Sequence, residues 1–508
     1  MTSEVLVVGA GPTGLVLALW LTRMGIRPRI IDKAPRAGTT SRALAVHART
    51  LELYGQLDLT DTVISTGRQV PAINMWVKGK PEARVIFNAI GGDLTPYPFM
   101  HILPQDEHER LLNERLNALG VTVERQTELS GYSEEGDRIV ATLRTPKGEE
   151  RCEVGYIAGC EGAHSIVRQT MGTGFPGGTY QHLFYVADVE ATGRSSDGEL
   201  HIDLDEADFL AVFPLKASGH VRLVGTVRDE RAQHADTLKF DDVKGRAIEH
   251  LQVQVRKVNW FSTYQVHHRV TEHFRRGHAF VLGDAAHIHS PAGGQGMNTG
   301  IGDAINLAWK LKAVLAKRAP EIILDSYESE RIAFARKLVY TTDKVFTMAT
   351  AEGKIAEIIR TRILPLVFPA AVRVSPWREW LFRTVSQIMI DYRGSWLSSG
   401  RAGEIHGGDR LPWLRGADNY RPLRATTWQV HVYGEAAPEL SAWCREHHLP
   451  LHSFAWHDDC AAAGFARDAL YLLRPDTYVA LAEDSGTPQA LERYCGERGL
   501  DLRSPEIS

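Results

Sequence analysis

Short apolar runs and one longer apolar segment alternate along the start of the chain. Val5–Val8 is apolar throughout, which predicts a buried parallel strand. The segment Leu15–Met24 predicts a buried helix that ends near Gly25. A second strand is expected at Arg29–Ile31, with Asp32 at its end. The order strand, turn, helix, strand predicts a parallel α/β unit at the N-terminus.

The hydrophobic period changes several times in the middle of the chain. Residues 75–90 and 130–155 are rich in strand-like segments, whereas Gln105–Leu119 carries leucines at helical spacing. From about Leu183 to Val266, apolar and polar residues alternate repeatedly. This alternation predicts several antiparallel strands that form a separate sheet. Ala279–Leu282 then returns to the pattern of a buried strand.

The last two hundred residues predict helices followed by a small α/β module. Residues 303–317 and 325–400 have helical patterns, and glycines at 407 and 408 with Pro412 mark a break. The strands expected after the break are Trp428–Tyr433, Leu451–Trp456, Ala469–Arg474 and Tyr478–Ala482, and the helices are Glu439–His447 and Pro488–Gly496.

Composition narrows the class of protein. The 508 residues are 44% hydrophobic and 24% charged, as in ordinary globular proteins. With 58 basic and 62 acidic residues the net charge is −4, so a nucleic-acid partner is not expected. The five cysteines are widely spaced and form no CxxC pair, which predicts a reduced, cytoplasmic protein. The apolar run Leu15–Leu21 is too short to span a bilayer, so no membrane span is expected.

The first candidate site is a glycine motif between the first strand and the first helix. Gly9, Gly11 and Gly14 form the pattern G-x-G-x-x-G. Such glycines give a tight turn, let the backbone approach a pyrophosphate, and let helix and strand pack closely. Asp32, at the end of the second strand, could accept hydrogen bonds from a ribose. This motif alone leaves both NAD and FAD open, as well as a glycine-rich turn without a ligand.

A second motif lies near residue 290. A strand delivers Gly283 and Asp284 to a loop, and Asp284 could bind the hydroxyls of a polyol. The glycine-rich stretch Pro291–Gly296 leaves its backbone free to lie against a planar ligand. A helix expected near Met297 would direct its amide dipoles at that ligand and stabilise an anionic reduced flavin.

Residues 278–311 strongly resemble the GD motif of the group A flavoprotein monooxygenases. This family includes para-hydroxybenzoate, phenol, polyketide and rifampicin hydroxylases. Other segments also resemble the family: Ser41–Ala43 with Arg49–Leu53, Leu103–Gln105, Asp303 with Asn306, and Asp325–Arg331. The resemblance extends over essentially the whole chain.

The resemblance implies a mixed α/β fold with three parts. A Rossmann-like FAD-binding domain is expected at 1–180 and 270–400, with a helical extension and with inserted sheet pieces at about 75–105. An antiparallel, substrate-binding sheet domain is expected at 181–269. Residues 410–508 are similar to the thioredoxin-like domain of the phenol-hydroxylase branch, but they lack CxxC, so thiol exchange is not expected.

The resemblance also implies an activity. NAD(P)H reduces FAD, O2 forms a flavin C4a-hydroperoxide, and a phenolic or polycyclic aromatic substrate is hydroxylated. Pro291 matches a position that lines the reacting face, and Arg42 matches a residue that gates flavin movement. The residues expected to bind the cofactor are Gly9, Gly11, Pro12, Thr13, Gly14, Asp32, Lys33, Arg42, Gln105, Glu161, Gly283, Asp284, Pro291, Gly294, Gly296, Met297 and Asn298.

Two features depart from a simple match. Glu161 stands before Gly162 where the family usually has Asp, which makes binding of the reductant less certain than binding of FAD. His287 and His289 form an H-x-H pair, but no acidic or cysteine cluster completes a metal site, so no metal is expected. The catalytic base is not identified, and a homodimer is left open.

The sequence leaves several activities open. Enzymes of the same fold perform Baeyer–Villiger insertion, oxidative decarboxylation or inactivation of aromatic antibiotics. A non-catalytic FAD-binding protein is a second alternative. An NAD-dependent dehydrogenase is suggested by the first motif only, and the second motif argues against it.

Overall fold

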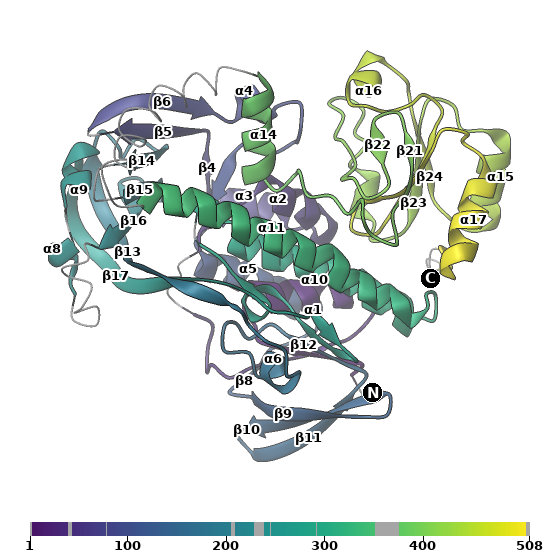
Figure 1. Cartoon of the computed structure of the whole chain (residues 1–508), viewed down its shortest axis with the longest axis horizontal. Coiled ribbons are helices and arrows are strands. Elements are labelled where there is room, and N and C mark those ends of the chain that lie inside the picture. The colour runs from purple at the N-terminus through teal and green to yellow at the C-terminus, as the bar shows by residue number, and fades with distance from the viewer. Residues whose placement is uncertain are drawn as a thin grey trace.

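The computed structural model forms three connected parts (Figure 1). The FAD-binding fold lies in the centre, a large twisted sheet lies on the left, and the C-terminal unit lies on the right. The residues that the structure describes are 3–38, 43–77, 79–204, 209–227, 238–243, 245–290, 292–350 and 375–503.

A six-stranded sheet carries the N-terminal unit, and its four central strands run parallel. Its order is β18 (Arg275–Arg276), β19 (Ala279–Val281), β12 (Tyr156–Gly159), β1 (Val5–Val8), β2 (Arg29–Asp32) and β8 (Glu124–Arg125). Helix α1 (Pro12–Arg23) packs against α5 (Gln105–Ala118) and α10 (Gly296–Leu315). The apolar residues of the first strand and first helix are almost completely buried, as their pattern predicts.

A second sheet has eight strands drawn from distant parts of the chain. Its order is β20 (His287–Ile288), β17 (Val253–Val270), β13 (Gly177–Gly193), β16 (His220–Val227), β15 (Phe209–Pro214), β14 (Leu200–Leu204), β5 (Ala72–Val77) and β6 (Lys80–Ile86). All its pairs are antiparallel except β14 with β5. The alternation between 183 and 266 therefore belongs to the predicted antiparallel sheet, which strands from residues 72–86 extend.

The two faces of this large sheet contact different parts of the molecule. On one face, Ala187, Val212 and Leu223 form a core with helices α8 (Phe240–Val243) and α9 (Arg246–His250). On the other face, Leu200 and Ala211 pack with residues of the central unit. The period of two along each strand produces this division.

The C-terminal unit is an α/β module with its own core. Its sheet order is β22 (Ile405–His406), β21 (Ser399–Ala402), β26 (Val479–Glu483), β25 (Leu470–Leu473), β23 (Gln429–Tyr433) and β24 (Leu451–Phe454). Its helices are α15 (Pro438–Glu446), α16 (Asp458–Ala462) and α17 (Pro488–Arg498). Strands β21 and β22 precede residue 410, so the sheet extends beyond the expected module on its N-terminal side.

The helical region after α10 is less continuous than its pattern predicts. Helix α11 (Asp325–Thr350) crosses the front of the molecule, and α14 (Ser375–Val385) lies above it (Figure 1). Residues 386–398 are not helical, and Gln387 has a left-handed φ of 60°, so the expected helix up to residue 400 is wrong there. Residues 351–374 lie outside the described part of the chain.

The remaining elements are short and connect or flank these sheets. Strands β3 (Ala45–Val46), β7 (Met100–Ile102) and β4 (Arg68–Val70) form one small sheet, and β9 (Glu128–Glu135), β10 (Arg138–Thr145) and β11 (Gly148–Val154) form another. The short helices are α2 (Ala48–Tyr54), η1 (Gly55–Leu57), α3 (Thr60–Thr66), α4 (Asn88–Gly91), α6 (Ile166–Thr170), η3 (Gly283–Ala285), η4 (Ala292–Gly294), η5 (Glu321–Leu324) and η7 (Pro422–Arg424). In the described ranges, no helix has both the length and the apolar character needed to cross a bilayer.

Candidate active site

Three distant segments of the sequence meet at the first glycine loop. Gly9 has φ +100°, and a Cβ there would lie 2.6 Å from the carbonyl oxygen of Cys160. A Cβ on Gly14 would collide with the carbonyl oxygen of Gly9. A Cβ on Gly283 would lie 2.7 Å from Oγ1 of Thr13. The glycines therefore let the segments around 9 and 160 pack backbone against backbone, and let the segment around 283 pack on the Thr13 side chain.

Gly11 differs from its neighbours because its surroundings are open. A Cβ built on it meets no atom within 4 Å, and its φ of −75° suits any residue. Beside it, the Asp32 carboxylate accepts hydrogen bonds from the backbone N–H of Ala10 (2.7 Å) and of Ala34 (2.8 Å). The loop is thus held to the end of β2, and open space lies in front of Gly11.

Further polar side chains gather near Asp32. The Arg125 guanidinium lies 3.7 Å from the Asp32 carboxylate. Gln105 donates to Oε1 of Glu109 (2.7 Å), and its backbone N–H donates to the carbonyl of Ala43 (3.1 Å). Burial raises the pKa of Glu109. The charge of Arg125 lowers this pKa, and the charge of Asp32 raises it. The structure thus brings Asp32 and Gln105 into one polar group, to which it adds Arg125.

The GD segment leads into the start of helix α10. The Asp284 side chain is exposed. The protein atoms around it nevertheless remove part of its hydration, and this desolvation raises the pKa of its carboxyl group. Gly293 and Gly294 have φ of 77° and 63°, a conformation that favours glycine. Gly296 begins α10, and the first amide groups of a helix have no partners within the helix. The loop therefore presents N–H groups that have no partner within the helix, and an accessible carboxylate.

A clamp of side chains fixes the loop behind these groups. Nε2 of His47 donates to the carbonyl oxygen of Gly294 (3.1 Å), and Nδ2 of Asn298 donates to the same oxygen (3.0 Å). Oδ1 of Asn298 accepts from the backbone N–H of His47 (2.9 Å). Gln387 donates to Oε1 of Gln295 (2.7 Å). The side chain of Asn298, expected to bind cofactor, is thus occupied in holding the loop.

Acid is expected to loosen this clamp through His47. Burial lowers the pKa of His47 from 6.5 to about 4, so the unfolded chain binds the proton more readily than the folded chain. The free energy of unfolding should therefore fall as the pH falls from 6.5 to 4. Between pH 7 and pH 5 this group contributes a loss of about 2 kcal/mol. Urea unfolding at both pH values, for wild type and His47→Gln, measures it: the loss should be smaller in the variant, and an equal loss in both would contradict this assignment.

Glu161 points into the protein. Its Oε1 accepts from the backbone N–H of Val167 (2.9 Å), and its Oε2 is buried and has no hydrogen-bond partner among the described residues. Burial raises the pKa of this carboxyl group. Nearby, Arg168 donates to the carbonyls of Ala285 (2.8 Å) and Ala163 (2.7 Å). This motif therefore braces the GD segment.

A buried charge network supports the same segment. Asp303 on α10 accepts from the backbone N–H of Gly283 (3.0 Å) and faces Nε2 of His287 (2.7 Å). Nε of Arg331 donates to its other oxygen (2.6 Å). His287 is thus paired with Asp303, a carboxylate that also binds Arg331. Within the described ranges, no group of three or more His, Cys, Asp or Glu side chains is arranged to hold a metal.

The other expected site residues are less informative. Pro12 is buried as the first residue of α1, Lys33 is exposed, and Met297 is half-buried in the first turn of α10. Arg42 and Pro291, the two residues expected to take part most closely in the reaction, lie outside the described residues.

The residues that meet here suit a dinucleotide with a polyol chain. The open space at Gly11 would admit a pyrophosphate, and the Asp284 carboxylate could accept hydrogen bonds from hydroxyl groups. Nε2 of His289 and Oγ of Ser290 are buried without a hydrogen-bond partner in the described part of the chain. Buried polar atoms of this kind call for a ligand or water. These observations fit FAD.

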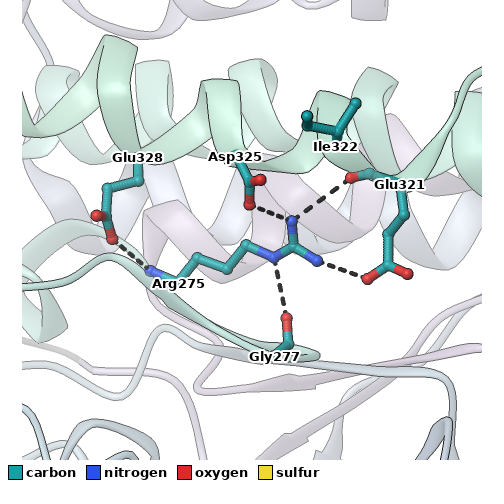
Figure 2. A pocket seen from close by; sticks show the side chains of 6 residues that line it. All are labelled: Arg275, Gly277, Glu321, Ile322, Asp325 and Glu328. Atoms are coloured by element: carbon teal, nitrogen blue, oxygen red, sulfur yellow. Dashed lines mark hydrogen bonds and ion pairs between the residues drawn. The ribbon is translucent and has the colours of Figure 1, made fainter.

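A pocket on the surface does not have these properties. It lies between β18 and the start of α11 and is lined by Arg275, Glu321, Asp325 and Glu328 (Figure 2). Arg275 donates to Glu321 and Asp325 at 2.6 Å each, and Figure 2 shows its guanidinium between the two. The charge of Arg275 is already neutralised by these two carboxylates. The residues of this pocket therefore form ion pairs at the surface, and the pocket is not the cofactor site.

The comparisons with known proteins agree with this geometry. A model of the FAD binding domain family matches residues 2–342. The 6-methylpretetramide 4-monooxygenase of Streptomyces rimosus is 37% identical over 372 residues, which are 73% of this chain and 65% of that protein's length. The 12-dehydrotetracycline 5-monooxygenase/anhydrotetracycline 6-monooxygenase of S. rimosus subsp. rimosus is 31% identical, covering 96% of this chain and 97% of its own. The solved structure of anhydrotetracycline hydroxylase from S. rimosus has a TM-score of 0.79 at 25% identity, covering 99% and 100% of the two chains.

The chain belongs to the FAD-dependent aromatic monooxygenases. It is a flavoprotein monooxygenase whose cofactor is FAD, and NAD(P)H and O2 are the co-substrates in this family. The fold predicted from the resemblance is confirmed. Neither an NAD-dependent dehydrogenase, nor a Baeyer–Villiger enzyme, nor a non-catalytic FAD-binding protein is favoured by these relatives.

Sequence reasoning missed several residues of this site. Arg125 is the second residue of a strand of only two residues, which is too short to show a period. His47 and Gln387 hold the loop from elements far away in the sequence, and no local pattern signals such contacts. For Asp303 a signal existed, since the family resemblance includes it, but its partner Arg331 could be identified only in space.

Proposed function

We propose that this protein hydroxylates a polycyclic substrate that carries a phenol. The observation that supports this proposal best is the apolar sheet face that meets the loop of the GD motif. Leu200 and Ala211 of that face belong to the same core cluster as Ala45, and a Cβ on Gly294 would lie 2.8 Å from Cβ of Ala45. Two relatives are named for pretetramide and tetracycline compounds, which favours a substrate with fused rings.

Partly buried apolar side chains continue this face. Ile202 pairs with Ala211, and Phe213 lies on the same side of β15 as Ala211. Both Ile202 and Phe213 pack against the cluster but keep part of their surface open. Apolar side chains with remaining accessible surface, one of them aromatic, suit a planar aromatic ligand.

The cofactor residues have separate roles in this proposal. Gly9, Gly11 and the start of α1 would hold the FAD phosphates, and Asp32 and Gln105 would lie on the ribose side. Asp284 would bind the ribityl chain, and the first amides of α10 would stabilise negative charge on the flavin. Bound FAD supplies the two-electron chemistry that links NAD(P)H oxidation to O2. The protein holds the ring close to that chemistry and excludes water.

Two further roles follow from the family resemblance. Pro291 would line the reacting face with its backbone, and Arg42 would gate the flavin. Gly294 and Gly296 follow Pro291 in the sequence; Gly294 ends η4 and Gly296 begins α10. The clamp on this loop would keep the reacting face in place.

Replacing Phe213 by alanine tests the substrate face. Loss of the ring should weaken binding of a polycyclic phenol about tenfold, since an aromatic side chain contributes roughly 1–2 kcal/mol in such contacts. Titration of the FAD-loaded enzyme with the phenol, followed by flavin absorbance, measures the change. Phe261→Ala is the matched control, because Phe261 packs on the opposite face of the same sheet. Equal weakening by both variants would contradict the assignment of the face.

Other parts of the proposal concern setting and organisation. A reduced, cytoplasmic location is supported by five cysteines that are all unpaired. The division into a FAD-binding domain, a substrate sheet domain and a thioredoxin-like domain is proposed with the boundaries given above. A homodimer and the lack of a nucleic-acid partner also stay predictions.

A further inference from the structure

The turn Arg474–Thr477 of the C-terminal unit is buried. It joins β25 to β26, yet Arg474, Asp476 and Thr477 are each at most 5% exposed. Turns between strands normally lie at the surface. Thr477 has φ +71°, which is unusual for a β-branched residue and persists only where the surroundings impose it. This turn is thus held in a strained shape inside the molecule.

The turn contacts helices α10 and α11 through a cluster of charges. Arg474 binds both oxygens of Glu330 on α11 (2.7 and 2.9 Å). Nζ of Lys310 on α10 donates to the same carboxylate (2.8 Å), and Nε1 of Trp309 donates to Asp476 (3.0 Å). Burial alone would raise the pKa of Glu330, but Arg474 and Lys310 hold it well below its usual range. The charges of two cations, Arg474 and Lys310, balance those of two anions, Glu330 and Asp476. Removing any one of the four would leave a buried charge without its partner.

The same turn contacts α2. Nη2 of Arg49 donates to the carbonyl oxygen of Asp476 (3.1 Å) and to Oγ1 of Thr477 (2.8 Å). Thr50, next on α2, donates to Oδ1 of Asn298 (2.7 Å), in the first turn of α10. Helices α2 and α10 are therefore tied to each other at the loop of the GD motif and to the C-terminal turn behind it. A small cavity of about 20 Å³, enough for a single water molecule, lies among residues of these three elements.

Arg331 links this region to the GD segment. It lies next to Glu330 on α11 and binds Asp303, which holds Gly283. Nη2 of Arg331 also donates to the carbonyl of Thr299 (3.1 Å), and Nη1 donates to Tyr392 (2.8 Å). A displacement of α10 or α11 would thus be carried to both ends of the loop, because a helix moves as a stiff unit.

We propose that the turn Arg474–Thr477 is a positioning element for the flavin loop. By completing the charge cluster on α10 and α11 and by anchoring α2, it fixes where α10 begins. The thioredoxin-like unit then contributes to cofactor geometry, and thiol chemistry has no part in its role. This inference rests on the proposed function in taking residues 283–298 as the flavin-binding segment.

The test compares two conservative variants with a control in the same unit. Asp476→Asn keeps the shape but removes a charge, and Arg474→Lys keeps the charge but loses the two-pronged contact. Arg401→Met is the control, because Arg401 pairs with the exposed Glu404 at the surface. For each protein the measurements are the Kd for FAD, the visible spectrum of bound flavin, the fraction of NAD(P)H electrons that end in hydrogen peroxide, and the thermal unfolding of the apoprotein.

Both turn variants should bind FAD about tenfold more weakly, at temperatures where they remain folded. Their flavin spectrum should shift and their peroxide fraction should rise, while Arg401→Met matches wild type. Lower unfolding temperatures with an unchanged Kd and spectrum would show a purely structural turn and overturn this inference alone. If Arg474→Lys does not fold, the FAD affinity, flavin spectrum and peroxide fraction of Asp476→Asn decide between the two outcomes. Failure of wild type itself to bind FAD would overturn the proposed function and this inference together.

Discussion

Replacing Gly11 by alanine is expected to abolish tight FAD binding without destabilising the apoprotein. The backbone of Gly11 is in a conformation open to any residue, and no atom of the chain lies within 4 Å of the added methyl group. The methyl group would occupy the space through which the loop approaches a pyrophosphate. A loss of at least about 100-fold in affinity, or roughly 2.7 kcal/mol, is expected.

Fluorescence titration of the apoprotein with FAD, together with urea unfolding without FAD, measures both quantities. Gly496→Ala is the matched control, since Gly496 also has open surroundings but lies on helix α17, far from the loop. It should bind FAD normally and unfold at slightly higher urea. Gly14→Ala should fail to fold, because its methyl group collides with Gly9. Normal FAD binding by Gly11→Ala would place the pyrophosphate elsewhere.

Replacing Arg331 by methionine is expected to cost about 3–5 kcal/mol of stability, on the order found when one partner of a buried ion pair is removed. Arg331 is 1% exposed, and its removal leaves the buried Asp303 carboxylate without its arginine. Desolvation would then raise the pKa of Asp303, which Arg331 now holds low. The backbone of Thr299 also loses a donor, so the start of α10 should loosen.

The control for this experiment lies at the surface pocket of Figure 2. Arg275 also binds two carboxylates, but those of Glu321 and Asp325 are 50% and 67% exposed. Water can replace these contacts, so Arg275→Met should cost about 1 kcal/mol or less. Urea unfolding of both variants at pH 7 compares the two sites. Similar losses at Arg331 and Arg275 would contradict the view that burial makes the inner network strong.

The local patterns of the sequence predicted the elements well and the contacts between them poorly. Val5–Val8 and the first helix are found where their apolar patterns place them, because both are buried on all sides. Glu161 lay in a recognisable motif, yet its inward direction depends on the space left by Gly159, which only the packing of β12 determines. The turn Arg474–Thr477 joins two strands that the sequence predicted, but nothing local shows that two helices cover it.

In the candidate site, too, the local motifs could be predicted from the sequence and the contacts between them could not. The glycine motif was identified from its spacing, and the GD motif from its resemblance to the monooxygenase family. Their contact across Thr13 and Gly283 comes from the parallel order of the first sheet, whereas the resemblance to the family implied only that both motifs bind FAD. The clamp of His47 and Gln387 was not anticipated, because the two side chains lie 247 and 92 residues away from the loop residues that they bind.

The most direct test of the central claim is oxygen transfer itself. The FAD-loaded protein would be supplied with NADH or NADPH, 18O2 and a panel of polycyclic phenols, and the products analysed by mass spectrometry. We predict that at least one phenol stimulates NAD(P)H consumption and gains a single 18O atom. If neither NADH nor NADPH reduces the bound flavin with any of the phenols tried, that result would contradict the assignment of this protein as an aromatic hydroxylase.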